Sequence, residues 1–133
     1  MTDYFSPVDG EINTKAMSSL GLAHMGDAIY ELMVRSFLCS CGELTAKALH
    51  RETVLRVSAP AQAKAAKKIE NELTTEERDV YNRGRNAKVN SVPSRARLSE
   101  YHAATGLETL FGELYLTGKI SRLNELFAII TED

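Results

Sequence analysis

The chain has 133 residues, a length that fits one domain of ordinary size rather than two. It is 44% hydrophobic and carries a formal net charge of -2, so we expect a core without disulfides and no binding of polyanions through overall positive charge. The charge is unevenly distributed, because residues 44–68 and 83–97 each carry a net +5 while 1–43, 69–82 and 98–133 each carry -4. Blocks of this kind favour a local anionic partner.

The sequence also indicates where the protein resides. Its N-terminus is acidic and polar, unlike a signal peptide, and no run of about 18 apolar residues predicts a membrane span. Cys39 and Cys41 are one residue apart, with no second cysteine pair and no histidine at zinc-finger spacing. We therefore expect reduced cysteines, no zinc site and a cytoplasmic protein.

Apolar residues recur at helical spacing and β-branched alternation is nearly absent, which predicts an all-α fold. An N-terminal arm at residues 1–15 precedes a single helical domain at 16–133. In chain order the pattern predicts helices at about 17–39, 45–57, 58–72, 74–83, 98–116 and 121–130, with a basic loop or frayed helix end at 84–97. The signals for these ends are the N-caps Thr45 and Ser58, the capping box Thr74-x-x-Glu77, and the breaks at Gly42 and Thr117-Gly118.

The first predicted helix carries a polar stripe opposite an apolar face. Asp27 lies in this stripe directly after Gly26, and glycine costs a helix interior about 1 kcal/mol relative to alanine. We therefore expect another backbone or a ligand to approach closely at Gly26. The alternative is a solvated face with an ordinary Glu31–Arg35 pair. The stripe is His24, Asp27, Glu31 and Arg35, and the apolar face is Leu22, Met25, Ile29, Leu32, Met33 and Phe37.

The helix at 98–116 has a carboxylate at the edge of its apolar face. This residue is Glu108, and the face is formed by Leu107, Leu110, Phe111 and Leu114. A charge at a core boundary needs a partner, which an ordinary salt bridge to an arginine would provide. If Asp27 and Glu108 instead meet across a helix interface, they form an oxygen-rich site suited to Mg²⁺.

The segment 83–97 is the clearest candidate for phosphate contact, because it holds five basic residues and no acid. Arginine offers a planar fork that matches phosphate oxygens, and lysine offers a point charge. A solubilising charged loop is the alternative. The candidate RNA-binding residues are Arg83, Arg85, Asn86, Lys88, Arg95 and Arg97.

Three motifs in this order and spacing resemble Mini-ribonuclease III. They are LAHMGDAIYELMVR at 22–35, RGRNAK at 83–88 and ATGLETLFGELYL at 104–116, and the resemblance extends from about residue 17 to 127. This family has the helical catalytic domain of ribonuclease III without a double-stranded-RNA-binding domain. The resemblance implies a Mg²⁺-dependent, homodimeric endoribonuclease with a ribonuclease III-like fold. It also implies that double-stranded RNA is the substrate, in maturation of the large-subunit (23S) ribosomal RNA precursor.

The resemblance also assigns roles to particular residues. Asp27 matches the acid of the ribonuclease III G-D signature, and Glu108 matches the glutamate of the second motif. The larger enzymes have further acids where this chain has Ala23 and Thr105. We therefore expect Asp27 and Glu108 to hold one metal and to be the catalytic acids, with water and RNA phosphate completing the coordination. Glu31 is an outer-shell candidate.

Two other functions are compatible with these residues. The missing acids favour a catalytically silent RNA-binding or ribosome-associated protein of the same fold. A helical protein-interaction module with no RNA role would instead bind no duplex at low salt. If the chain is a nuclease, the dimer must itself supply the basic surface that holds RNA.

Overall fold

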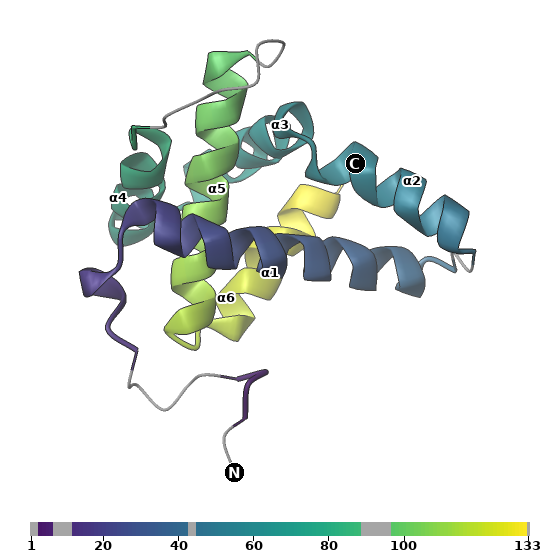
Figure 1. Ribbon diagram of the computed structural model, residues 1–133, viewed down its shortest axis with the longest axis horizontal. Coiled ribbons are helices and arrows are strands. Elements are labelled where there is room, and N and C mark those ends of the chain that lie inside the picture. Colours follow the sequence, from purple (N-terminus) through teal and green to yellow (C-terminus); the bar gives the residue numbers. More distant parts are fainter. Residues whose placement is uncertain (1–2, 7–11, 43–44, 89–96, 133) are drawn as a thin grey trace.

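The computed structural model describes residues 3–6, 12–42, 45–88 and 97–132, and in these ranges every regular element is a helix (Figure 1). The predicted all-α class is confirmed. The α-helices are α1 (Ser19–Ser40), α2 (Ala46–Val57), α3 (Ala59–Ile69), α4 (Thr75–Arg85), α5 (Leu98–Leu116) and α6 (Ile120–Thr131). Two short 3₁₀ turns lie at Thr14–Ala16 and Glu70–Glu72.

The helices begin and end close to the residues that the sequence marks. Thr45 and Ser58 accept hydrogen bonds from backbone N–H groups three residues ahead, as N-caps do. Gly42 and Gly118 have φ of 94° and 76°, in the left-handed region that glycine adopts readily after a helix. The third helix ends at Ile69, before the predicted position, because the chain continues as a 3₁₀ turn, and α4 extends to Arg85.

Helix α5 lies at the centre of the molecule and contacts α1, α3, α4 and α6 (Figure 1). Its predicted apolar face is confirmed, since Leu107, Leu110 and Phe111 have no exposed surface. The ring of Tyr30 packs edge-on against Phe111 at 5.3 Å between centroids and against Phe127 at 5.9 Å. This aromatic contact joins α1, α5 and α6 in one core.

One expected core residue is not in the core. Leu32 of α1 is 53% exposed, although the sequence pattern places it on the apolar face. The buried stripe advances in steps of four residues through Tyr30, Val34 and Leu38. Four residues are slightly more than one helical turn, so each step shifts the buried stripe around the helix, away from the side on which Leu32 lies.

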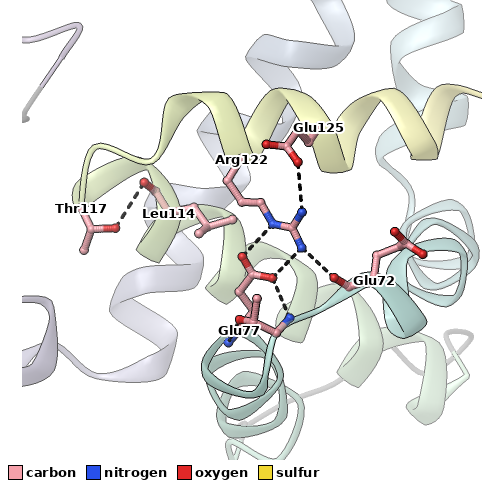
Figure 2. Close-up of polar contacts among 7 residues, drawn as sticks. Glu72, Glu77, Leu114, Thr117, Arg122 and Glu125 are labelled. Atoms are coloured by element: carbon pink, nitrogen blue, oxygen red, sulfur yellow. Dashed lines mark hydrogen bonds and ion pairs between the residues drawn. The ribbon is translucent and has the colours of Figure 1, made fainter.

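Arg122 of α6 forms hydrogen bonds that join α6 to the start of α4 (Figure 2). Its Nε and Nη2 donate to the two carboxylate oxygens of Glu77 at 2.8 and 2.9 Å, and Nη2 also donates to the carbonyl of Glu72. Glu77 completes the predicted capping box with Thr74. Burial acts to raise the pKa of Glu77, but the hydrogen bonds from Arg122 and the Thr74 backbone outweigh it and lower the pKa. The pair therefore joins α4 to α6 mainly when Glu77 is ionised.

Candidate active site

Two glycines bring the backbones of α1 and α5 into contact. A Cβ on Gly26 would overlap the carbonyl oxygen of Glu108 and lie 2.8 Å from the amide nitrogen of Gly112. A Cβ on Gly112 would in turn overlap the carbonyl oxygen of Leu22. The close backbone approach predicted at Gly26 is therefore confirmed. Because Asp27 follows Gly26, this crossing holds Asp27 beside Glu108.

The Asp27 and Glu108 side chains lie close enough for Asp27 to act on the pKa of Glu108. Asp27 is exposed, whereas Glu108 is partly buried between the helices. Burial is the main cause that raises the pKa of Glu108 to about 7, and a hydrogen bond from Gln62 opposes this rise. The charge and hydrogen bonding of Asp27 raise the pKa of Glu108 further. Two carboxylates from separate helices thus face each other, which is the arrangement that a divalent cation neutralises.

Sequence reasoning missed Gln62 of α3. This side chain is 3% exposed, and its Nε2 donates to the carbonyl of Val57 at 2.9 Å and to Glu108 Oε2 at 3.2 Å. Its Oε1 is buried without a hydrogen-bond partner. Position 62 shares a helical stripe with Ala65, Ala66 and Ile69, which are also buried. The only glutamine of the chain, in an otherwise apolar stripe, was the available signal.

Ala23 and Thr105, which stand where the larger ribonuclease III enzymes have acids, provide no carboxylate for a metal ion. Ala23 is buried, and the Thr105 hydroxyl donates to the Tyr101 carbonyl at 3.0 Å within α5. Glu31 lies one turn after Asp27 and pairs with Arg35 at 2.7 Å, as its spacing indicates. Among the described residues, no group of three or more histidines, cysteines, aspartates or glutamates is arranged to hold a metal. The protein therefore offers two carboxylates, and any cation there keeps open coordination positions.

Asp27 is accessible from outside through an open hollow of about 470 Å³. Glu31 and Arg35 line its polar side, and Met25 and Leu32 line its apolar side. A large substrate can therefore approach Asp27 along the exposed face of α1.

The basic residues lie on α4 and beside α5, and all those described are exposed. Gly84 separates Arg83 from Arg85 and packs against Thr109, since a Cβ there would overlap the Thr109 side chain. The basic turn is thus fixed to the part of α5 that carries Glu108. The positions are Arg83 and Arg85 in the last turn of α4, Asn86 at its C-cap, Lys88 just beyond it and Arg97 at the N-cap of α5, while Arg95 lies outside the described residues.

These basic side chains line two surfaces rather than one. Arg83 borders one shallow hollow, together with the neutral Asn86 and the acidic Asp79. Arg85 borders another, together with Lys67 of α3 and Arg78 of α4. This separation follows from helical geometry, because residues two apart on a helix point to nearly opposite sides. Arg78 was not among the predicted RNA-binding residues. Lys67 belongs to a second basic surface that the sequence indicates together with Lys64 and Lys68, for which an ordinary solvated helix face is the alternative.

Within the described ranges, no helix has the length and apolar character needed to cross a membrane.

Comparison with known proteins shows the family. The ribonuclease III domain family matches residues 20–119. The chain is 44% identical over 114 residues to mini-ribonuclease 3 of Enterococcus faecalis, covering 84% of this chain and 86% of that protein. It is 40% identical to mini-ribonuclease 3 of Thermoanaerobacter sp. over 86% of this chain and 80% of that one.

A solved structure has the same fold. The crystal structure of a Fusobacterium nucleatum protein superposes with a TM-score of 0.79 at 32% identity, covering 87% of this chain and 93% of that chain. Together with the sequence matches over most of the chain, this similarity shows the family. The chain therefore belongs to the ribonuclease III family, in its mini-ribonuclease 3 group, and is an endoribonuclease.

Proposed function

We propose that this protein is a Mg²⁺-dependent endoribonuclease that cleaves double-stranded RNA, with the large-subunit (23S) ribosomal RNA precursor as its natural substrate. The observation that carries the proposal is the meeting of Asp27 and Glu108 at the glycine-lined crossing of α1 and α5. Family membership supports the reaction class, and the names of the relatives support the mini-ribonuclease 3 type of enzyme.

Two carboxylates suit a Mg²⁺ ion that keeps some of its coordination positions for water and substrate. They do not suit a metal ion whose ligands all come from the protein. Mg²⁺ prefers oxygen ligands and commonly keeps several waters, so two carboxylates plus a substrate phosphate suffice. Asp27 and Glu108 would hold the cation, and neutralising their mutual repulsion would favour binding. Gln62 Oε1 is buried without a hydrogen-bond partner, on the amide whose Nε2 donates to Glu108. Among the described residues no third histidine, cysteine or acid joins this pair, which argues against two metals held by protein alone.

Each group in the site has a defined task in the proposed reaction. When bound, Mg²⁺ supplies a water of lowered pKa and stabilises charge on the phosphoryl oxygens. Asp27 and Glu108 fix where that chemistry occurs. Glu31, one turn along from Asp27 and paired with Arg35, is positioned to accept hydrogen bonds from water in the hollow.

The basic residues would hold the RNA backbone. An A-form duplex is recognised through phosphates and 2′-hydroxyls more than through sequence, and exposed arginines suit this task. Arg83, Arg85, Asn86, Lys88 and Arg97 meet that requirement, and Arg95 is proposed with them from the sequence alone. Binding through these residues would weaken steeply with salt because each phosphate contact releases counterions.

The proposed working form is a homodimer in the cytoplasm. Exposed apolar side chains on α1 and α2 that do not line the hollow at Asp27 support a partner surface, and they are Leu20, Val54 and Leu55. A two-fold dimer would present two sites, one for each strand of the duplex. Cys39 and Cys41 are free and exposed, which suits a reducing compartment.

The decisive experiment compares cleavage of long double-stranded RNA in Mg²⁺ and in chelator. We expect cleavage that requires Mg²⁺, and we expect Asp27→Asn or Glu108→Gln to abolish cutting while duplex binding persists. Glu100→Gln, on the same helix as Glu108, is the matched control and should cut normally. Absence of cleavage by the wild-type chain in Mg²⁺, with intact duplex binding, would favour the catalytically silent RNA-binding protein. A wild-type chain that binds no duplex at low salt would favour an interaction module.

A further inference from the structure

Gln62 is a buried polar side chain that donates a hydrogen bond to Glu108 and that the proposed reaction has not yet used. It lies on α3, whose other residues are alanines, lysines, Pro60 and Ile69, and is 3% exposed. Burying an amide without hydrogen bonds costs several kcal/mol on transfer scales, so its placement requires partners. Those partners define what the side chain does.

The turn between α2 and α3 orients the side-chain amide of Gln62. Ser58 ends α2 and caps α3, and it turns the chain so that the Val57 carbonyl, at the last residue of α2, meets Gln62 Nε2 at 2.9 Å. A carbonyl at a helix end lacks an intrahelical partner, so this bond satisfies both groups. With one Nε2 hydrogen fixed on Val57, the second is directed at Glu108 Oε2, at 3.2 Å. The amide thus connects the backbone of α2 to the carboxylate of α5.

A hydrogen bond to one carboxylate oxygen restricts rotation of the whole group. Glu108 reaches from α5 toward Asp27, and like charges would otherwise drive the two side chains apart when no cation is bound. Gln62 opposes that movement because it holds Oε2 from the side of α3. A neutral amide can do this without adding charge, whereas a lysine would compete with the cation.

We propose that Gln62 is a positioning residue that keeps the Glu108 carboxylate oriented toward Asp27 for binding of a divalent cation. The inference rests on the proposed function, because it assigns Gln62 a role in that same site. Partners that orient ligating carboxylates typically contribute about 10–100-fold to metal affinity or activity.

The test measures metal affinity without RNA. Gln62→Met keeps the side-chain length and removes both donors, and Gln62→Asn keeps the amide but withdraws it from Glu108. Mn²⁺ binding followed by electron paramagnetic resonance and Mg²⁺ binding followed by calorimetry give the affinities. Thr53→Val is the control. Thr53 is a buried polar residue of α2, and unlike Gln62 it makes no hydrogen bond to Glu108.

We expect Gln62→Met and Gln62→Asn to weaken Mg²⁺ binding by about 10-fold or more, and Thr53→Val to leave it unchanged. In cleavage assays the half-saturating Mg²⁺ concentration should rise by the same factor, with most of the rate restored at high Mg²⁺. Duplex binding in chelator should remain at the wild-type level. Urea unfolding of each variant separates these effects from loss of the fold.

The outcomes separate the two proposals. If wild-type protein binds Mg²⁺ and cleaves RNA, and both folded Gln62 variants do so with wild-type affinity, then Gln62 is structural and this inference is wrong while the proposed function stands. The inference is equally wrong if the control lowers the Mg²⁺ affinity as much as the Gln62 variants do. If wild-type protein neither binds Mg²⁺ nor cleaves, the proposed function fails and the inference fails with it.

Discussion

Replacing Glu108 with glutamine should stabilise the metal-free protein at neutral and higher pH while it removes activity. Glu108 is partly buried beside Asp27, and its pKa is raised to about 7 by burial first and by Asp27 in addition. In the unfolded chain the same carboxyl ionises near its ordinary value of 4.5. The native state therefore holds a proton that the unfolded state releases.

This difference fixes both the sign and the size of the effect. Because the native state binds the extra proton, the contribution of Glu108 to the free energy of unfolding is largest below pH 4.5 and declines as pH rises to about 7. Over the interval between the two pKa values, this contribution to the free energy of unfolding falls by about 3 kcal/mol. Glutamine is always neutral and still accepts the hydrogen bond from Gln62, so Glu108→Gln should gain about 1–3 kcal/mol over wild type at pH 8 and little at pH 4.

Urea unfolding in chelator at pH 4, 6 and 8 measures this difference directly. Glu100→Gln controls for the general loss of one negative charge from α5. Adding Mg²⁺ should stabilise wild type and leave Glu108→Gln nearly unchanged, because a ligand stabilises only the state that binds it. If Glu108→Gln were less stable than wild type at pH 8, or if the difference did not depend on pH, Glu108 would not be a strained acid facing Asp27.

The other predictions concern the crossing of α1 and α5 at Gly26, the Arg122–Glu77 ion pair and the basic residue Arg83. Gly26→Ala should destabilise the fold by about 1–3 kcal/mol and reduce metal binding, since its Cβ overlaps the backbone of α5. Gly21→Ala should cost less in the same urea assay, because its Cβ would meet the Ser18 side chain at 3.1 Å rather than a backbone. Arg122→Met should cost about 1–2 kcal/mol at pH 7. That loss should shrink as pH falls through the lowered pKa of Glu77 in the wild-type protein, because protonated Glu77 no longer pairs with Arg122. A loss that did not depend on pH would contradict the role of the ion pair. Arg83→Ala should weaken duplex binding and reduce the salt slope by about 1, and an unchanged slope would remove Arg83 from phosphate contact.

The sequence predicted the helices well because their end signals are local. Thr74 and Glu77 form a capping box within four residues, and Gly42 ends α1 through its own backbone conformation. Such features need no distant partner, so they can be recognised from spacing alone. The 98–116 helix was likewise predicted by its periodicity, because its central position buries a wide apolar face.

The errors and omissions concern contacts between helices. Leu32 is exposed because the buried stripe of α1 is set by its neighbours and drifts along the helix. Arg85 turns toward Lys67 and Arg78, away from the hollow that Arg83 lines, which no count of charges along the chain reveals.

By itself, the sequence determined the all-α class and most of the helix ends, and it singled out Asp27 and Glu108 as candidate acids, because these follow from local spacing and motif. Only the tertiary structure decided that the two carboxylates face each other, since this requires the backbones of α1 and α5 to touch at Gly26 and Gly112. It also brought Gln62 to Glu108 from 46 residues away. Such a contact depends on how three helices pack, and packing is a property of the folded chain rather than of any one segment.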